Sequence, residues 1–142
     1  MKINVYKLLF MMFLALSIGA NAQVKYFTDI NNRQIKTLQV KVAGEPFSDP
    51  YIFLGGEEQI EINFDFMGDG FPRYAYNVIH CNADWTKSQL SPIEYMDGFQ
   101  GMTIDDYTNS ISTTTQYANY SLFFPNENIQ FKVSGNYAIQ VY

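Results

Sequence analysis

The sequence predicts an all-β domain with the fold of an immunoglobulin-like antiparallel β-sandwich. Three observations support this prediction. Apolar and polar residues alternate along several short segments, as they do in strands with one buried face. Residues that form turns, mostly Gly, Pro and Asn, separate these segments. No window after residue 22 has an apolar stripe with a period of 3.6 residues, so long amphipathic helices are not expected.

The first predicted strands alternate clearly. Residues 36–42 and 58–66 each place apolar side chains on one face and polar side chains on the other. The apolar faces comprise Leu38, Val40 and Val42 in the first strand and Ile60, Ile62, Phe64 and Phe66 in the second. A short apolar strand is expected at 51–54, after a turn that contains two prolines. The glycine-rich stretch 67–72 predicts a hairpin turn, and 73–81 is predicted to be the returning strand.

The pattern changes after Trp85. Residues 86–109 contain two glycines, one proline and no sustained period, which indicates a long connection with at most one helical turn. Strand patterns resume in 110–125, 128–135 and 136–142. The last of these resembles the penultimate strand of a sandwich, so the closing strand is missing from the sequence. Two explanations remain open: the sequence is a fragment of a longer protein, or a segment of another chain fills the exposed edge.

The N-terminus has the features of a secretory signal peptide, predicted to comprise residues 1–22. Lys2 and Lys7 make the start of the chain positively charged, and an uncharged run follows at 8–18. The small residues Ala20 and Ala22 then form an A-x-A cleavage site. The run is too short to span the roughly 30 Å of hydrocarbon in a bilayer as a helix. Cleavage after Ala22 leaves one exported domain, residues 23–142.

The charge of the predicted mature domain excludes two classes of partner. Of the nine basic residues, two lie before residue 23, whereas all 14 acidic residues lie after it, so the formal charge is 7 − 14 = −7. An acidic chain without a basic cluster is a poor ligand for nucleic acid or for an anionic membrane surface. The single cysteine cannot form an internal disulfide, so the domain must be stabilised by its core.

The chain's only histidine, cysteine and tryptophan lie within one segment, 78–85, which raises the question of a metal or catalytic site. Neighbouring residues of a strand point to opposite faces, so His80 and Cys81 cannot both reach one ion. Structural zinc needs four ligands, and thiol catalysis needs a histidine placed against the thiol. We therefore predict structural roles: Cys81 as a small buried residue, Trp85 as a core or rim aromatic, and Asp84 in the turn. No catalytic, metal or cofactor site is predicted.

A series of motifs in a fixed order identifies a family. The motifs are "NRQIKTLQVKV", "IFLGG", "INFDFMGDGFPRYAYNVIHCNADWTKSQL", "IEYMDGFQGMTIDDYTNS" and "PNENIQFKVSGNYAIQVY". From about residue 35 onward, this series resembles the N-terminal domain of the type IX secretion system plug proteins of Gram-negative bacteria. The residues that carry the resemblance, here called the signature residues and expected to be structural, are His80, Cys81, Asp84, Trp85, Tyr95, Gly98, Phe99, Gly135 and Tyr137.

The resemblance implies a function. Proteins of this kind are periplasmic, lack enzymatic activity and cofactors, and associate with the large outer-membrane β-barrel translocon of the secretion system. They are thought to seal the periplasmic side of this barrel without inserting into the membrane themselves. They continue for several hundred residues with further β-rich domains, which agrees with the missing strand.

The aromatic-rich connection 86–109 is the segment that we expect to face a partner. The candidate contact residues are Tyr95, Met96, Phe99 and Met102. The alternative, that these side chains cover one open end of the core, is equally compatible with the sequence.

A competing function from another class is an exported carbohydrate-binding sandwich. It would require aromatic residues on one exposed sheet face, where they could stack on sugar rings. The face formed by Tyr74, Tyr76, Val78 and His80 could be such a platform or could belong to the core. A hydrolase that uses the lone Cys81 is a third, more distant hypothesis.

Overall fold

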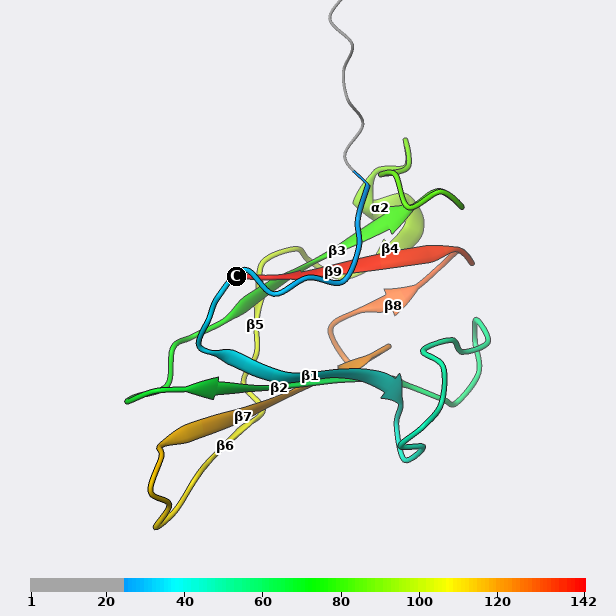
Figure 1. Cartoon of the computed structure of the whole chain (residues 1–142). Coiled ribbons are helices and arrows are strands. Elements are labelled where there is room, and N and C mark those ends of the chain that lie inside the picture. The colour runs from blue at the N-terminus through cyan, green and yellow to red at the C-terminus, as the bar shows by residue number, and fades with distance from the viewer. Residues whose placement is uncertain (1–24) are drawn as a thin grey trace, which may run out of the picture.

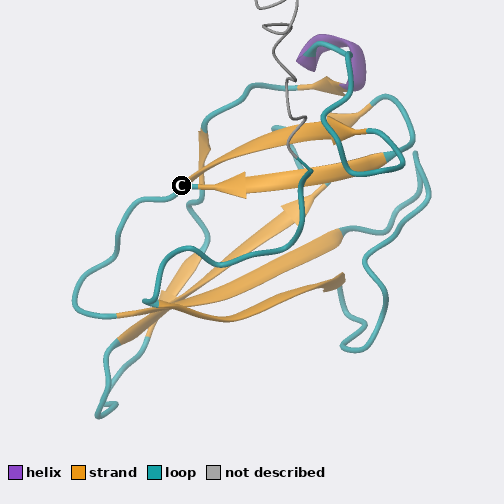
Figure 2. Ribbon diagram, turned by 45° about the horizontal axis from the view of Figure 1, so that its top comes forward, coloured by secondary structure: helices purple, strands orange, loops and turns teal. Residues whose placement is uncertain are grey.

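Two antiparallel β-sheets packed face to face form the domain (Figures 1 and 2). The computed structural model describes residues 25–142. The predicted signal peptide, with Ala20 and Ala22, lies outside the described residues. The first sheet contains, in spatial order, β1 (Ile35–Val42), β2 (Ile60–Met67), β7 (Tyr117–Phe124) and β6 (Tyr107–Asn109). The second contains β5 (Met102–Thr103), β3 (Ala75–Cys81) and β9 (Asn136–Val141).

The strand order is that of an immunoglobulin sandwich. The order β1-β2-β7-β6 corresponds to the A-B-E-D sheet, and β3-β9 corresponds to strands C and F of the facing sheet. The predicted all-β sandwich is thereby confirmed. Among the described strands β9 pairs only with β3, so no described strand lies at the position of the closing strand G.

A small third layer lies against the two sheets. It consists of the single-turn helix α2 (Pro92–Tyr95) and of the strand pair β4 (Met96–Asp97) and β8 (Gln130–Phe131). The helix begins with a capping box, in which the backbone N–H of Ser91 donates to the carboxylate of Glu94 at 2.7 Å. The predicted single helical turn in the 86–109 connection is therefore present.

The core is aromatic and lies between the sheets. The inward face of β2 follows the predicted alternation, and in β7 every second residue is buried as well. The main buried residues are Ile62, Phe64, Phe66, Tyr76, Val78, Tyr120, Leu122 and Phe124. Phe64 stacks on Tyr120 with ring centroids 5.2 Å apart, and Tyr76 meets Phe124 edge to face at 5.3 Å.

Two predictions about the first half of the chain are wrong. The segment 67–72 is not a hairpin turn, because β2 and β3 belong to different sheets. Alternation fixes which face of a strand is buried but not which strand lies beside it. The connection crosses between the layers, and the hydroxyl of Tyr120 donates to the Pro72 carbonyl at 2.8 Å and fixes it there. The segment 51–54 is not a strand either, because its backbone forms local turns and pairs with no sheet edge.

Candidate functional site

The signature residues cluster where β3 ends. His80 packs between two tyrosines: its ring centroid is 5.7 Å from that of Tyr95 and 5.1 Å from that of Tyr137. Its Nε2 lies 3.4 Å from the carbonyl oxygen of Ser134. Gly135 must be glycine at this point, because its φ is +151° and a Cβ there would overlap His80 Nε2. The sole histidine is thus part of a tight aromatic cluster.

Tyr137 occupies the position of the tyrosine corner of immunoglobulin-like folds. Tyr137 lies at the start of β9, and its hydroxyl donates to the carbonyl oxygen of Val133, four residues upstream, at 2.7 Å. Burial raises the pKa of Tyr137 to about 12. The hydroxyl also lies 3.3 Å from the carbonyl oxygen of Tyr95, so Tyr137 joins β9 to helix α2.

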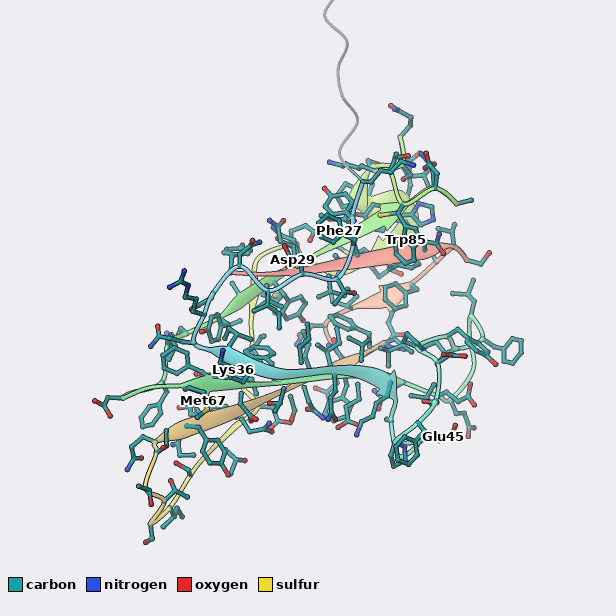
Figure 3. All side chains as sticks on the ribbon, in the orientation of Figure 1. Phe27, Asp29, Lys36, Glu45, Met67 and Trp85 are labelled. Atoms are coloured by element: carbon teal, nitrogen blue, oxygen red, sulfur yellow. The ribbon has the colours of Figure 1, made fainter. Side chains whose placement is uncertain are left out.

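The turn after β3 is held by Asp84. Its carboxylate accepts hydrogen bonds from the hydroxyl of Thr86 at 2.6 Å and from the Thr86 N–H at 3.1 Å. These two hydrogen bonds keep the pKa of Asp84 below its usual value. Trp85 adopts a φ of +64° within this turn, and its partly exposed side chain lies at the rim near Phe27 (Figure 3). Asp84 therefore has the turn-forming position predicted for it.

Cys81 is buried, and burial raises the pKa of its thiol. A raised pKa reduces the fraction of thiolate, which is the reactive form. The thiol lies 3.6 Å from the carbonyl oxygen of Ile79, within its own strand. Among residues 25–142, no three His, Cys, Asp or Glu side chains are close enough together to hold a metal ion.

Tyr95 and Gln100 secure the edge of β3. The Tyr95 hydroxyl donates to the carbonyl oxygen of the fully buried Val78 at 2.8 Å. The Gln100 amide pairs with both backbone groups of Val78, accepting from its N–H at 2.8 Å and donating to its carbonyl at 2.6 Å. The Gln100 amide thus makes the hydrogen bonds to Val78 that a neighbouring strand would make, at a point along β3 that β5 no longer covers. The sequence reasoning missed Gln100, although it directly follows the motif "EY-x-x-GF".

Gly98 permits close packing between β4 and β8. It has a φ of +128°, and a Cβ there would overlap the Asn128 carbonyl oxygen and lie 2.8 Å from Ile129 Cδ1. Next to it, Asp97 pairs with Lys132 at 2.6 Å. The 95–100 segment is therefore folded tightly against β8 and β3.

This packing corrects part of the predicted contact surface. Tyr95 and Met96 are buried, so they cannot face a partner in this fold, and the alternative that they cover the core holds for them. Met96 lies where β4 pairs with β8, and Tyr95 packs against His80 of β3 and Tyr137 of β9. Met102 is half-buried and packs against the core cluster. Phe99 is exposed, and its contact with a partner stays a prediction.

The face considered as a sugar platform belongs to the core. Tyr76 and Val78 are buried, and Tyr74 packs edge to face against Phe64 with ring centroids 5.4 Å apart. A sugar ring cannot stack on any of these faces without opening the sandwich. His80 shares this face and stacks on the Tyr95 ring.

A hollow of about 930 Å³ lies over β3, between the segment near Tyr26 and residues 87–92. Its lining includes Asn77, Ile79 and Gln140 but no carboxylate, imidazole or thiol. The hollow therefore lacks the side chains that most often serve as general acid or base in hydrolysis.

The long connection between β1 and β2 is the most exposed apolar part of the described chain. Residues 43–59, here called the β1–β2 loop, extend beyond the end of β1 and away from the C-terminus (Figure 1). Phe47, Tyr51 and Phe53 are 101%, 71% and 78% exposed. Sequence reasoning missed this surface because it assigned 51–54 to a strand. A signal was available in the prolines and glycines that bracket the aromatic residues.

The described residues therefore define an immunoglobulin-like sandwich domain in which His80 and Cys81 are packed into the framework at the end of β3. Residues 35–142 match the family model of the type 9 secretion system plug protein 1st domain. The chain belongs to this family, which confirms the resemblance found in the sequence and gives the protein a role related to type IX secretion. The family implies a protein associated with the cell envelope.

A solved structure has a similar fold. The chain is 78% identical to a hypothetical protein from Parabacteroides merdae ATCC 43184, whose crystal structure was determined at 2.30 Å resolution, and the TM-score is 0.83. The similarity covers 84% of this chain and 30% of that one, so the chain spans less than a third of that protein's length. No curated protein matches the chain. Within residues 25–142, no helix has the length and apolar character needed to cross a bilayer.

Proposed function

We propose that this domain belongs to a non-enzymatic periplasmic plug, which associates with the outer-membrane β-barrel translocon of the type IX secretion system and seals it. The family match over residues 35–142 is the observation that carries the proposal. The protein would reach the periplasm through the signal peptide predicted at residues 1–22.

The arrangement of the signature residues supports a structural rather than a chemical role. His80, Tyr95 and Tyr137 pack on one another, and Asp84 holds a turn. A seal must present a surface of fixed shape to its partner, and such packing provides a rigid framework for it. We therefore infer that the protein acts by binding and needs no cofactor.

Carbohydrate binding, the competing function, is favoured by no observation in the described residues. Besides the core face described above, the exposed rings of Phe71 and Tyr107 stack on each other with centroids 5.8 Å apart. Tyr107 also stacks on Tyr120 with ring centroids 5.5 Å apart, so part of its ring is already in contact with other aromatic residues. A flat pair of free aromatic faces, which a sugar platform requires, is not formed there.

The experiment that tests the proposal is an affinity purification from envelopes solubilised in detergent. The natural gene product, tagged at its C-terminus, would be the bait, and bound proteins would be identified by mass spectrometry. Recovery of a very large outer-membrane β-barrel is expected. If repeated purifications recover no such barrel, the proposed association is wrong. The N-terminus of the purified protein should be Gln23, which tests the predicted cleavage in the same sample.

A further inference from the structure

The β1–β2 loop concentrates exposed apolar side chains in a short stretch of chain. Phe47, Tyr51, Phe53 and the half-exposed Leu54 lie within eight consecutive residues. Single exposed apolar residues are common on protein surfaces, but several on one projecting loop are typical of an interaction site. Aromatic side chains are also enriched among the residues that contribute most to protein binding.

Hydrogen bonds within the loop hold it in a defined shape. The Ser48 hydroxyl accepts from the Val42 N–H at 2.8 Å and donates to the Glu45 carbonyl at 3.0 Å. At the far side, the Ala43 N–H donates to the Gln59 carbonyl at 2.8 Å, and the Gln59 side chain donates to the Pro125 carbonyl at 2.6 Å. The aromatic residues are thus presented by an ordered loop, which lowers the entropy lost on binding.

The loop is also strongly acidic. It contains four carboxylates, Glu45, Asp49, Glu57 and Glu58, and the sequence has no Lys, Arg or His between Lys41 and Arg73. The formal charge of the loop is therefore −4. The two salt bridges found in the described part of the chain involve none of these four carboxylates. Glu45 lies outside the two sheets, where a partner can reach it (Figure 3).

The combination of exposed aromatic residues and negative charge in the β1–β2 loop favours a protein partner over a membrane. Loops that insert aromatic residues into a membrane usually carry Lys or Arg beside them, because envelope lipids include anionic headgroups. Four carboxylates would be repelled by such a surface. A protein recess with an apolar floor and a rim of Lys or Arg complements both the aromatic residues and the charge.

We propose that the β1–β2 loop is the element with which this domain docks onto the translocon, at an apolar recess bordered by basic residues. The inference rests on the proposed function and adds the contact site to it. Phe47 and Phe53 are the anchors that enter the recess, and the carboxylates pair with the basic rim. This assignment moves the predicted contact away from the 86–109 connection, where only Phe99 remains a candidate.

The test compares variants of the natural gene product. Phe47→Ser together with Phe53→Ser removes both anchors, and neither ring is buried, so the fold should not change. Ile111→Ser is the matched control, because Ile111 is 86% exposed and lies outside the loop. Phe99→Ser tests the earlier candidate. Each variant would serve as bait in the affinity purification. The affinity of each variant for the barrel that the unaltered protein recovers would then be measured by surface plasmon resonance. Circular dichroism melts would confirm that the variants remain folded.

We expect the anchor variant to bind the barrel about 30-fold more weakly or worse, which is the change that truncation of a hot-spot aromatic causes. Ile111→Ser should bind as the unaltered protein does. Glu57→Gln with Glu58→Gln should weaken binding and make it less sensitive to salt, since it removes charges from the pairing. If the anchor variant retains full affinity while the unaltered protein captures the barrel, the docking inference is wrong although the proposed function stands. If the unaltered protein captures no barrel, both are wrong.

Vesicles provide the remaining arm of the test. The unaltered protein and the anchor variant would be sedimented with vesicles of phosphatidylethanolamine and phosphatidylglycerol. We expect no binding of either protein. Binding that the anchor variant loses would show that the loop inserts into lipid, and the protein-docking inference would be overturned.

Discussion

Gly98→Ala should destabilise the domain severely, because the structure leaves no room for a methyl group. The added Cβ would overlap the Asn128 carbonyl oxygen and lie 2.8 Å from Ile129 Cδ1, where carbon atoms normally stay about 3.5–4.0 Å apart. Ile129 is fully buried and the obstructing carbonyl belongs to the backbone, so neither neighbour can move without disturbing β8.

The magnitude has two contributions. A residue with a Cβ at a φ of +128° costs about 1–3 kcal/mol in backbone strain. Forcing extra volume into a packed contact costs about 1–3 kcal/mol more. The sum of about 2–6 kcal/mol is a large share of the roughly 5–15 kcal/mol that stabilises a typical domain. For a domain of this size we expect the melting temperature to fall by roughly 10–25 °C.

Thermal and urea unfolding, followed by circular dichroism, would measure the effect. Gly44→Ala is the matched control, because Gly44 has a φ of +81° and a Cβ there would meet no atom within 4 Å. That variant should lose only about 1–2 kcal/mol from backbone strain. If the two variants melt within a few degrees of each other, the close approach of β4 to β8 is not a feature of the folded protein and the reasoning is refuted.

Three further predictions concern the signature residues. Stability should fall as the pH rises from 10 towards 12, because an unfolded tyrosine loses its proton near pH 10 whereas Tyr137 in the fold keeps its proton to about pH 12. Tyr137→Phe should reduce this fall in stability, which urea unfolding at a series of pH values would measure. An unchanged dependence of stability on pH would contradict the pKa assigned to Tyr137. The Cys81 thiol should react with Ellman's reagent only after unfolding in urea, because burial covers the thiol and raises its pKa. Fast reaction of the native protein would show that the thiol is accessible and would contradict this prediction. Tyr95→Phe should lower the free energy of unfolding in urea by about 1 kcal/mol, because the carbonyl of Val78 keeps its hydrogen bond from Gln100. The double variant Tyr95→Phe with Gln100→Leu should lose more free energy of unfolding than the two single variants together.

Several features could be predicted from local sequence because they depend on neighbouring residues. The alternation in 58–66 predicted the correct buried face of β2, since a strand turns every second side chain to the same side. The turn role of Asp84 was predictable because an Asp side chain reaches backbone groups two residues further on. The structural role of the segment around His80 and Cys81 also agrees with the packing observed.

Other features depended on contacts between distant segments. The prediction of a hairpin at 67–72 failed because β2 pairs with β1 and β7, and β3 pairs with β5 and β9, rather than with each other. The burial of Met96 and Tyr95 could not be read locally, because it results from the pairing of β4 with β8 and from the packing of Tyr95 on His80 and Tyr137. Gln100 was missed for the same reason: its importance lies in the backbone groups of Val78, which only the fold brings to it.

The sequence by itself therefore determined the fold class, the buried faces of β1 and β2 and the family, because these depend on local periodicity and on the order of motifs. Only the tertiary structure decided which aromatic residues are free to meet a partner. Phe53 lies between Pro50 and Gly55, and Tyr95 lies between Pro92 and Gly98, so the turn residues that flank them do not decide which of the two is buried. Tyr95 is buried because it packs against His80 and Tyr137, which come from strands β3 and β9. Phe53 is exposed, and its segment pairs with none of the described strands.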